Sequence, residues 1–336
     1  MDWFEKLTGF RESTYAETRA RLRVAEGRLH SLVNGAHYGI GNLSLISLAD
    51  LLAQTAAASS DGGRLKASIV VGDVRQMHHD ASNAGALFQV ASQFNLLEMA
   101  SPDVTPERGV TRYAHDGTQG PTCAIAAGAA TIYRNYFAPV GDAEGQTAER
   151  QLDGLADMGQ AFCASLGTGI DQLWQMRNGY ALASKSGLAA ISRHLTTCDD
   201  AEIDRLRGLL RIGLHSNVEV TDAPGPDRPY VSQAFCSALP VAYGVTSPDW
   251  EGFARLVLEA AYEATFRAAL HQARAGGSNR VFLTLLGGGA FGNRGPWIYD
   301  ALERAMRMFA TCDLDIRLVS YGAPKWDIET LIGAFQ

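Results

Sequence analysis

The clearest pattern in the chain is an alternation of short apolar runs and longer amphipathic stretches in its last third. A long amphipathic stretch opens at Ser247-Pro248 and stops at Gly276-Gly277, which is typical of a helix with defined ends. The apolar runs Val281–Leu286 and Ile316–Ser320 follow, and a second amphipathic stretch, Pro296–Phe309, lies between them. Strands that alternate with helices predict a largely parallel sheet with covering helices.

Three further apolar runs extend this sheet. Ala67–Asp73 and Leu87–Ala91 are rich in strand-forming residues and lead into polar residues, and Tyr230–Leu239 reads as a buried strand. We therefore expect an α/β fold with a mostly parallel or mixed sheet flanked by helices. The polar ends of the first two strands are expected to line a site.

Two regions with few strand signals are predicted to be helical. Residues 11–57, amphipathic over Tyr15–Val33, make up most of a predicted N-terminal helical extension over residues 1–63. Residues 140–215 predict a helical insertion with the stretches Gln151–Leu166, Ser186–Leu195 and Ala201–Ile212. The remaining domain, residues 64–336, is then α/β and is interrupted by the insertion.

Charge and composition narrow the class of protein. The chain has 46% hydrophobic and 19% charged residues, as ordinary globular proteins do. A net charge of −7 argues against binding to a nucleic-acid backbone, which normally requires a basic patch. The segment Met1–Lys6 has no signal-peptide pattern and no stretch approaches 18 apolar residues, so we expect a cytoplasmic protein without a membrane partner.

Cysteine and histidine spacing gives no sign of a metal site or a bound cofactor. The five cysteines include no Cys-x-x-Cys pair, and the eight histidines include no His-Glu-x-x-His. Most of the thiols are expected to be buried.

A glycine-rich loop joins the strand Val281–Leu286 to the following helix. Consecutive glycines at such a position let backbone N–H groups approach a phosphate, and the helix dipole adds to the attraction. We expect the loop to bind a diphosphate through Gly287, Gly288, Gly289, Ala290, Phe291, Gly292 and Asn293. The alternative is a tight packing turn, and Phe291 is then either a ring free to stack on a sugar or base, or a core aromatic.

Gly287–Asn293 resembles the second ADP-ribose-binding loop of macrodomains, which commonly reads Gly-x-Phe-Gly after small residues. Val71-Gly72-Asp73-Val74 is similar to the Gly-Asp-Ile element of that family, and Val90–Asn95 occupies the place of its Val-Asn-Ala-Ala-Asn strand end. The resemblance covers residues 69–99 and 280–322 and extends to poly(ADP-ribose) glycohydrolases. Their Gln-Glu-Glu motif is absent, and the family's first glycine-rich loop does not follow Asn95.

The resemblance implies a macrodomain-like fold and a ligand that is ADP-ribose or an ADP-ribosylated substrate. It implies that Asp73 and Val74 hold the adenine end, that the glycine-rich loop holds the diphosphate, and that Asn95 contacts the ribose. Hydrolysis of an ADP-ribosyl linkage is the implied activity, and a non-catalytic ADP-ribose reader is the first alternative.

Glycosidic hydrolysis needs a polar group close to the anomeric carbon. We consider Asn95, Glu98, Asp116 and Gln119 for this role. Glu98 follows an apolar strand, so its carboxyl is either buried with a raised pKa or solvated on a loop. Asp116 and Gln119 alternatively form the turn and cap of the next helix.

The segment Gln119–Ala124 also supports a different hydrolase. Thr118 is a possible N-cap, which would place Cys123 near the start of a helix, where the dipole lowers a thiol pKa. Such an arrangement is similar to papain-like peptidases, with His215 or His271 as the partner base. A third alternative is an interaction protein in which the glycine-rich loop is only structural.

Overall fold

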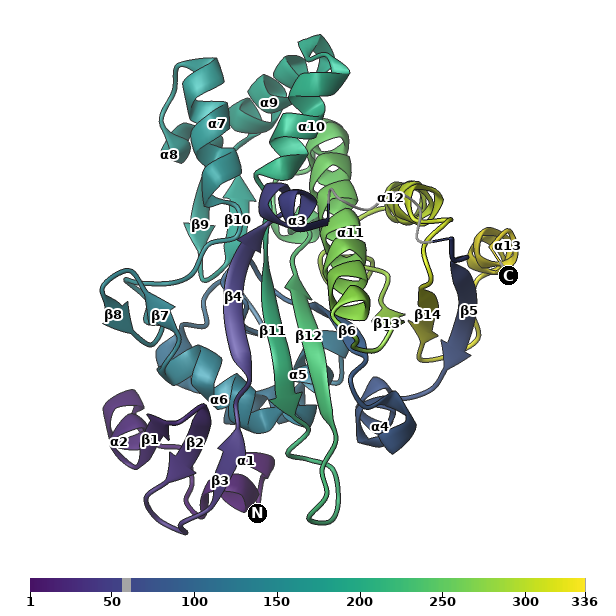
Figure 1. Cartoon of the computed structure of the whole chain (residues 1–336). Coiled ribbons are helices and arrows are strands. Elements are labelled where there is room, and N and C mark those ends of the chain that lie inside the picture. Colours follow the sequence, from purple (N-terminus) through teal and green to yellow (C-terminus); the bar gives the residue numbers. More distant parts are fainter. Residues whose placement is uncertain (56–61, 336) are drawn as a thin grey trace.

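The computed structural model describes residues 1–55 and 62–335, and its centre is a mixed seven-stranded sheet (Figure 1). The strand order is β4 (Asn42–Ser47), β11 (Arg211–Glu219), β12 (Tyr230–Cys236), β6 (Leu87–Ala91), β13 (Arg280–Leu283), β14 (Asp315–Ser320) and β5 (Lys66–Val71). The strands from β12 to β5 are parallel, whereas β4 and β11 are antiparallel to their neighbours. The predicted α/β class with a mixed sheet is confirmed.

Helices cover both faces of the sheet (Figure 1). The helices of one face are α3 (Leu48–Thr55), α11 (Trp250–Arg274) and α12 (Gly295–Met308), and those of the other are α4 (Val74–His79), α5 (Gln119–Ala126) and α6 (Gly128–Tyr136). Successive strand residues point to opposite faces, so Leu87 packs in the core of the first face and Phe88 in that of the second. Burial on both sides explains why β6 is an unbroken apolar run apart from Gln89.

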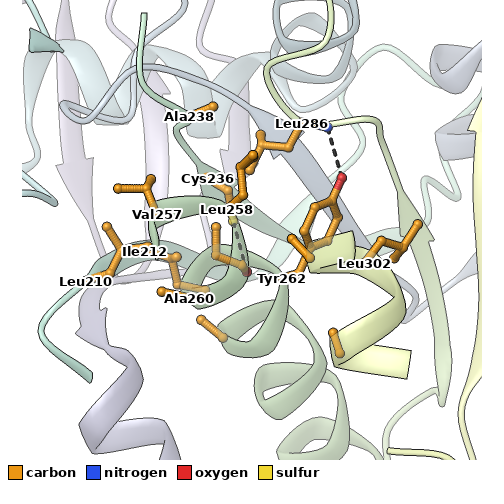
Figure 2. Close-up of a cluster of buried hydrophobic side chains, with 14 of the residues drawn as sticks. Leu210, Ile212, Cys236, Ala238, Val257, Leu258, Ala260, Tyr262, Leu286 and Leu302 are labelled. Atoms are coloured by element: carbon orange, nitrogen blue, oxygen red, sulfur yellow. Dashed lines mark hydrogen bonds between the residues drawn. The ribbon is translucent and has the colours of Figure 1, made fainter. Parts of the chain in front are cut away.

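The core beneath α11 also fixes the start of the glycine-rich loop. Figure 2 shows α11 side chains packed against residues of the sheet, with Tyr262 directed at Leu286. The Tyr262 hydroxyl donates to the Thr284 carbonyl at 2.7 Å and accepts from the Leu286 N–H at 3.0 Å. A buried hydroxyl with both bonds satisfied therefore holds the chain where it leaves β13.

The N-terminal region is not a helical extension. The predicted amphipathic helix over residues 15–33 is wrong. Before residue 48 the structure has only two short helices, α1 (Trp3–Thr8) and α2 (Tyr15–Ala20). They are followed by the strands β1 (Leu22–Ala25), β2 (Arg28–Ser31) and β3 (His37–Gly39). Glu26 and Gly27 adopt φ values of 51° and 69°, and two positive φ angles form the tight turn that suits a hairpin. Next, β4 joins the central sheet and α3 confirms a helix near residue 48, while residues 56 and 57 of the prediction lie outside the described residues.

Residues 140–215 contain the helices α7 (Ala156–Leu166), α8 (Ile170–Leu173), α9 (Lys185–Thr197) and α10 (Asp200–Gly208), and α7, α9 and α10 overlap the three predicted helical stretches. Three details differ from the prediction. β11 begins where the third predicted helix was to end. The short helix α8 and a hairpin of β9 (Trp174–Arg177) and β10 (Tyr180–Ala183) were not predicted. The remaining elements are β7 (Pro139–Val140), β8 (Ala143–Glu144) and α13 (Trp326–Gly333), with short 3-10 turns between 81 and 243. Within residues 1–55 and 62–335, no helix combines the length and apolar composition needed to cross a bilayer.

Candidate functional site

A cavity of about 640 Å³ lies at the carboxyl ends of the parallel strands. Residues that follow β5, β6, β13 and β14 line it, together with the loop before α5. Neighbouring strands are spaced ~4.8 Å apart, so the three spacings from β5 to β6 span roughly 14 Å. The cavity therefore suits an elongated ligand, at the edge of the sheet where α/β folds bind ligands.

Most of the residues predicted for the site reach this cavity. The predicted residues that line it are Asp73, Val74, Glu98, Gln119, Gly287, Gly289, Ala290 and Phe291. Those that do not are Asn95, Gly288, Gly292 and Asn293.

The glycine-rich loop crosses the middle of the cavity wall as a closed turn. The Asn293 N–H donates to the Gly287 carbonyl at 2.9 Å, and its side-chain amide donates to the Leu239 carbonyl at 2.8 Å. Gly287 has a φ of 73°, and a Cβ there would lie 2.5 Å from the Ala238 methyl. By contrast, a Cβ at Gly289 meets no atom within 4 Å, so this part of the backbone faces open space. Gly287 and Asn293 shape the turn, and Gly289 presents it to the cavity.

One end of the cavity is formed where β5 and β14 finish. Asp73 caps α4 by accepting from the Arg75 N–H at 2.8 Å, and Tyr321, which is 88% exposed, lines the same end. The Arg75 guanidinium donates twice to the Asp222 carboxylate, at 2.6 and 2.7 Å. That bidentate pair neutralises the arginine and fixes its orientation.

The Glu98 carboxyl lies at the other end and is almost fully buried. Only 4% of the residue is exposed, and within the part of the chain that the structure describes its Oε1 has no hydrogen-bond partner. Burial raises the pKa of Glu98 well above its ordinary value. The positive charge of Arg134 offsets only part of this rise, and the negative charge of Asp116 adds to it. A buried carboxyl with a raised pKa and an oxygen free of hydrogen bonds is suited to donate a proton.

Side-chain oxygens hold the backbone on both sides of Glu98. Three consecutive N–H groups donate to them: Leu97 to Asn95 Oδ1 (3.1 Å), Glu98 to the Tyr113 hydroxyl (2.9 Å) and Met99 to Gln93 Oε1 (2.8 Å). Asn95 is fully buried, and its amide also donates to Gln151. The expected ribose contact of Asn95 is therefore not part of the geometry, and the residue supports the loop that presents Glu98.

Gln119 links α5 to the sheet. Its Oε1 accepts from the Ala91 N–H at 2.9 Å and its Nε2 donates to the Gln89 carbonyl at 2.7 Å, so the side chain continues the hydrogen bonding of β6. Asp116 accepts from the N–H and the hydroxyl of Thr118, as turn-forming aspartates do. Both residues line the cavity, with the Gln119 amide and Oδ1 of Asp116 already hydrogen-bonded.

Gly120, which follows Gln119, permits the closest approach in the site. A Cβ there would lie 1.9 Å from the Ala91 carbonyl oxygen and 2.5 Å from Glu98 Oε2. The start of α5 can reach β6 and Glu98 only because this residue has no side chain. In the sequence, Gly120 reads only as part of a Gly-Pro turn.

Three aromatic rings form one wall of the cavity and come from separate segments. The centre of the Phe291 ring lies 5.2 Å from that of Tyr180 and 5.8 Å from that of Tyr243, and the centres of the two tyrosine rings are 5.1 Å apart. All three residues line the cavity. Phe291 thus packs against neighbouring rings and borders the ligand space as well, while Tyr180 is brought there by the unpredicted hairpin.

The structure contradicts the cysteine-hydrolase alternative. Cys123 is completely buried in the second turn of α5, and burial raises its thiol pKa well above the ordinary value. His215 bonds Arg134 instead, and His271 lies on α11. Cys236 and Cys312 are also buried, as expected for most of the thiols, and none of the five cysteines forms a disulfide. Across residues 1–55 and 62–335, no cluster of three or more His, Cys, Asp or Glu is arranged to hold a metal ion.

Bacterial poly(ADP-ribose) glycohydrolase structures are similar to this chain over nearly its whole length. The enzyme from Thermomonospora curvata matches with 14% identity and a TM-score of 0.47, covering 96% of this chain and 95% of that one. The enzyme from Deinococcus radiodurans in complex with ADP-ribose matches with 12% identity and a TM-score of 0.41, covering 97% and 96%. No protein-family model and no curated protein matches. Because these identities lie below 25% and the TM-scores below 0.5, they assign neither an activity nor residue roles to this chain.

Proposed function

We propose that this protein binds ADP-ribose in the cavity and hydrolyses an ADP-ribosyl glycosidic bond with Glu98 as the general acid. The observation that carries the proposal is a buried carboxyl with an unpartnered oxygen at one end of a cavity that runs along the strand ends. A glycine backbone faces the middle of that cavity. From the Asp73 end to the Glu98 end, the cavity can therefore hold the base, the diphosphate and the distal ribose of ADP-ribose in that order.

The base end is assigned to Asp73 and Tyr321. An aspartate fixed by its capping bond accepts from an exocyclic amine, and an exposed ring beside it stacks on a purine. The diphosphate is assigned to the Gly287–Ala290 backbone, because Arg75 is occupied by Asp222. The N-terminus of α5 points to the same cavity and adds a favourable dipole.

The distal ribose then lies between Glu98 and Phe291. Protonated Glu98 gives its proton to the leaving atom as the bond to the anomeric carbon breaks. Water adds its hydroxyl to that carbon, and the second proton of the water returns to the Glu98 carboxylate. The products are free ADP-ribose and the protonated acceptor.

Release of ADP-ribose from ADP-ribosylated protein tests the proposal, with Glu98→Gln as the matched variant. We expect the wild type to release ADP-ribose and Glu98→Gln to lose on the order of 10²–10⁴-fold in kcat. Calorimetry should show that Glu98→Gln still binds ADP-ribose. Binding without release by the wild type would instead make the protein an ADP-ribose reader, and the absence of binding would refute the proposal.

A further inference from the structure

Arg134 on α6 is a fully buried cation without a hydrogen-bonded carboxylate among the described residues. Its guanidinium donates to the Leu96 carbonyl at 3.2 Å, to the Thr131 hydroxyl at 2.9 Å and to His215 Nδ1 at 3.3 Å, all neutral acceptors. One face lies 3.8 Å from the centre of the Phe235 ring. A buried charge is normally compensated, so its position calls for an explanation.

The carboxyl that most affects this charge is that of Glu98. Burial lowers the pKa of Arg134 to about 10, and Glu98 is the largest influence that opposes the shift. The other titratable groups around Glu98 are supplied by separate elements: Tyr113 before α5, Asp116 in the loop, Cys123 on α5 and Tyr180 on β10. His215 on β11 accepts from the arginine, and its pKa is lowered well below normal by burial and by Arg134, so it adds no charge.

Arg134 also touches the loop that carries Glu98. Leu96 has a φ of 65°, a backbone conformation that costs a leucine on the order of 1 kcal/mol. The Arg134 guanidinium holds the carbonyl of this residue, two positions before Glu98. Gln146 ties the same segments together by donating to the Asn95 and Arg134 carbonyls.

We infer that Arg134 is a positioning residue for Glu98, which fixes the strained loop through the Leu96 carbonyl and adds a buried positive charge to the surroundings of that loop. The inference rests on the proposed function for its kinetic consequences. The charge keeps the Glu98 proton transferable, and the hydrogen bond keeps the carboxyl aimed at the cavity. Arg134 touches no ligand in this arrangement, so its removal lowers kcat and leaves KM unchanged.

The test compares Arg134→Gln and Arg134→Lys with the wild type over a range of pH. Arg134→Gln should lower kcat by on the order of 10²-fold, because a displacement of the acid is costly. The alkaline limb of its kcat profile should move up by about 1 pH unit, since a nearby cation lowers a carboxyl pKa. Arg134→Lys keeps the positive charge but cannot reproduce the three hydrogen bonds of the planar guanidinium. Its kcat should therefore fall, while the alkaline limb of its kcat profile stays at the same pH.

Tyr136→Phe is the control on the same helix. Its buried hydroxyl bonds Glu12, so the change costs stability without moving the pH profile or kcat. An unmoved limb in folded Arg134→Gln would overturn the electrostatic role, and full kcat in Arg134→Lys would overturn the positioning role. If Arg134→Gln does not fold, Arg134→Lys alone decides the positioning role.

A ¹³C titration of the Glu98 carboxyl separates this inference from the proposed function. We expect the carboxyl of Glu98 to titrate higher in Arg134→Gln than in the wild type, whether or not the protein turns over a substrate. If the wild type releases no ADP-ribose, the proposed function fails, and an unchanged titration would independently refute the electrostatic role of Arg134.

Discussion

Gly289→Leu should weaken ligand binding by orders of magnitude without loss of stability. The structure allows this separation because a Cβ at Gly289 meets no atom within 4 Å and its φ is not positive, whereas Gly287 is held at a φ of 73° against Ala238. A leucine at Gly289 therefore folds without strain, and its side chain fills the part of the 640 Å³ cavity that we assign to the diphosphate.

The size of the effect follows from the lost contacts. Hydrogen bonds from the backbone to a charged phosphate contribute about 1.5–3 kcal/mol each, so losing two of them costs about 3–6 kcal/mol. A loss of that size weakens binding by roughly 10²–10⁴-fold. The free energy of unfolding should change by less than about 0.5–1 kcal/mol, because a residue with compatible backbone angles replaces a glycine.

The assay is calorimetric titration with ADP-ribose, accompanied by thermal unfolding of the same samples. Gly333→Leu is the matched control, since a Cβ there is equally free of contacts and the residue lies on α13 away from the cavity. Unchanged affinity in a folded Gly289→Leu protein would refute the assignment of the diphosphate to this loop.

Three further changes test other parts of the account. Glu98→Gln should be as stable as the wild type at low pH and more stable at high pH. The pKa of Glu98 is raised in the folded protein, so the wild type loses stability as pH rises through that pKa, whereas glutamine does not ionise. If the free energies of unfolding of the two proteins do not diverge with pH in denaturant titrations, the buried-acid assignment is refuted. Gly120→Ala should cost about 1–3 kcal/mol in denaturant unfolding and reduce kcat, because its methyl displaces either Ala91 or Glu98. Cys123→Ala should retain ADP-ribose release, whereas loss of activity in a folded protein would reopen thiol chemistry.

Hydrophobic runs predicted the sheet well because parallel strands buried on both faces are nearly continuous apolar segments. Leu87–Ala91 forms a strand with the predicted bounds, and the long helix and the strands on either side of the glycine-rich loop are also confirmed. The hairpins were missed, although the sequence carries signals for them. Asn178-Gly179 has φ values of 47° and 79°, and an Asn-Gly pair between short apolar runs is a strong hairpin signal.

The candidate site was only partly predictable for a physical reason. Glu98 and the glycine-rich loop follow strands directly, so their place at the edge of the sheet can be read from the chain. Tyr113 bonds the Glu98 N–H from 15 residues further along the chain, and Arg134 bonds the Leu96 carbonyl from 38 residues further along. No local sequence pattern reveals contacts over such separations. Asn95 was assigned to the ligand from its place in a motif, whereas tertiary packing turns its amide toward Leu97 and Gln151.

A crystal structure of the Glu98→Gln variant with ADP-ribose tests the central claim most directly. We predict the base beside Asp73 and Tyr321, the diphosphate on the Gly287–Ala290 backbone and the anomeric carbon of the distal ribose next to the substituted residue at position 98. A ligand bound in the reverse direction, or outside the cavity, would contradict the account.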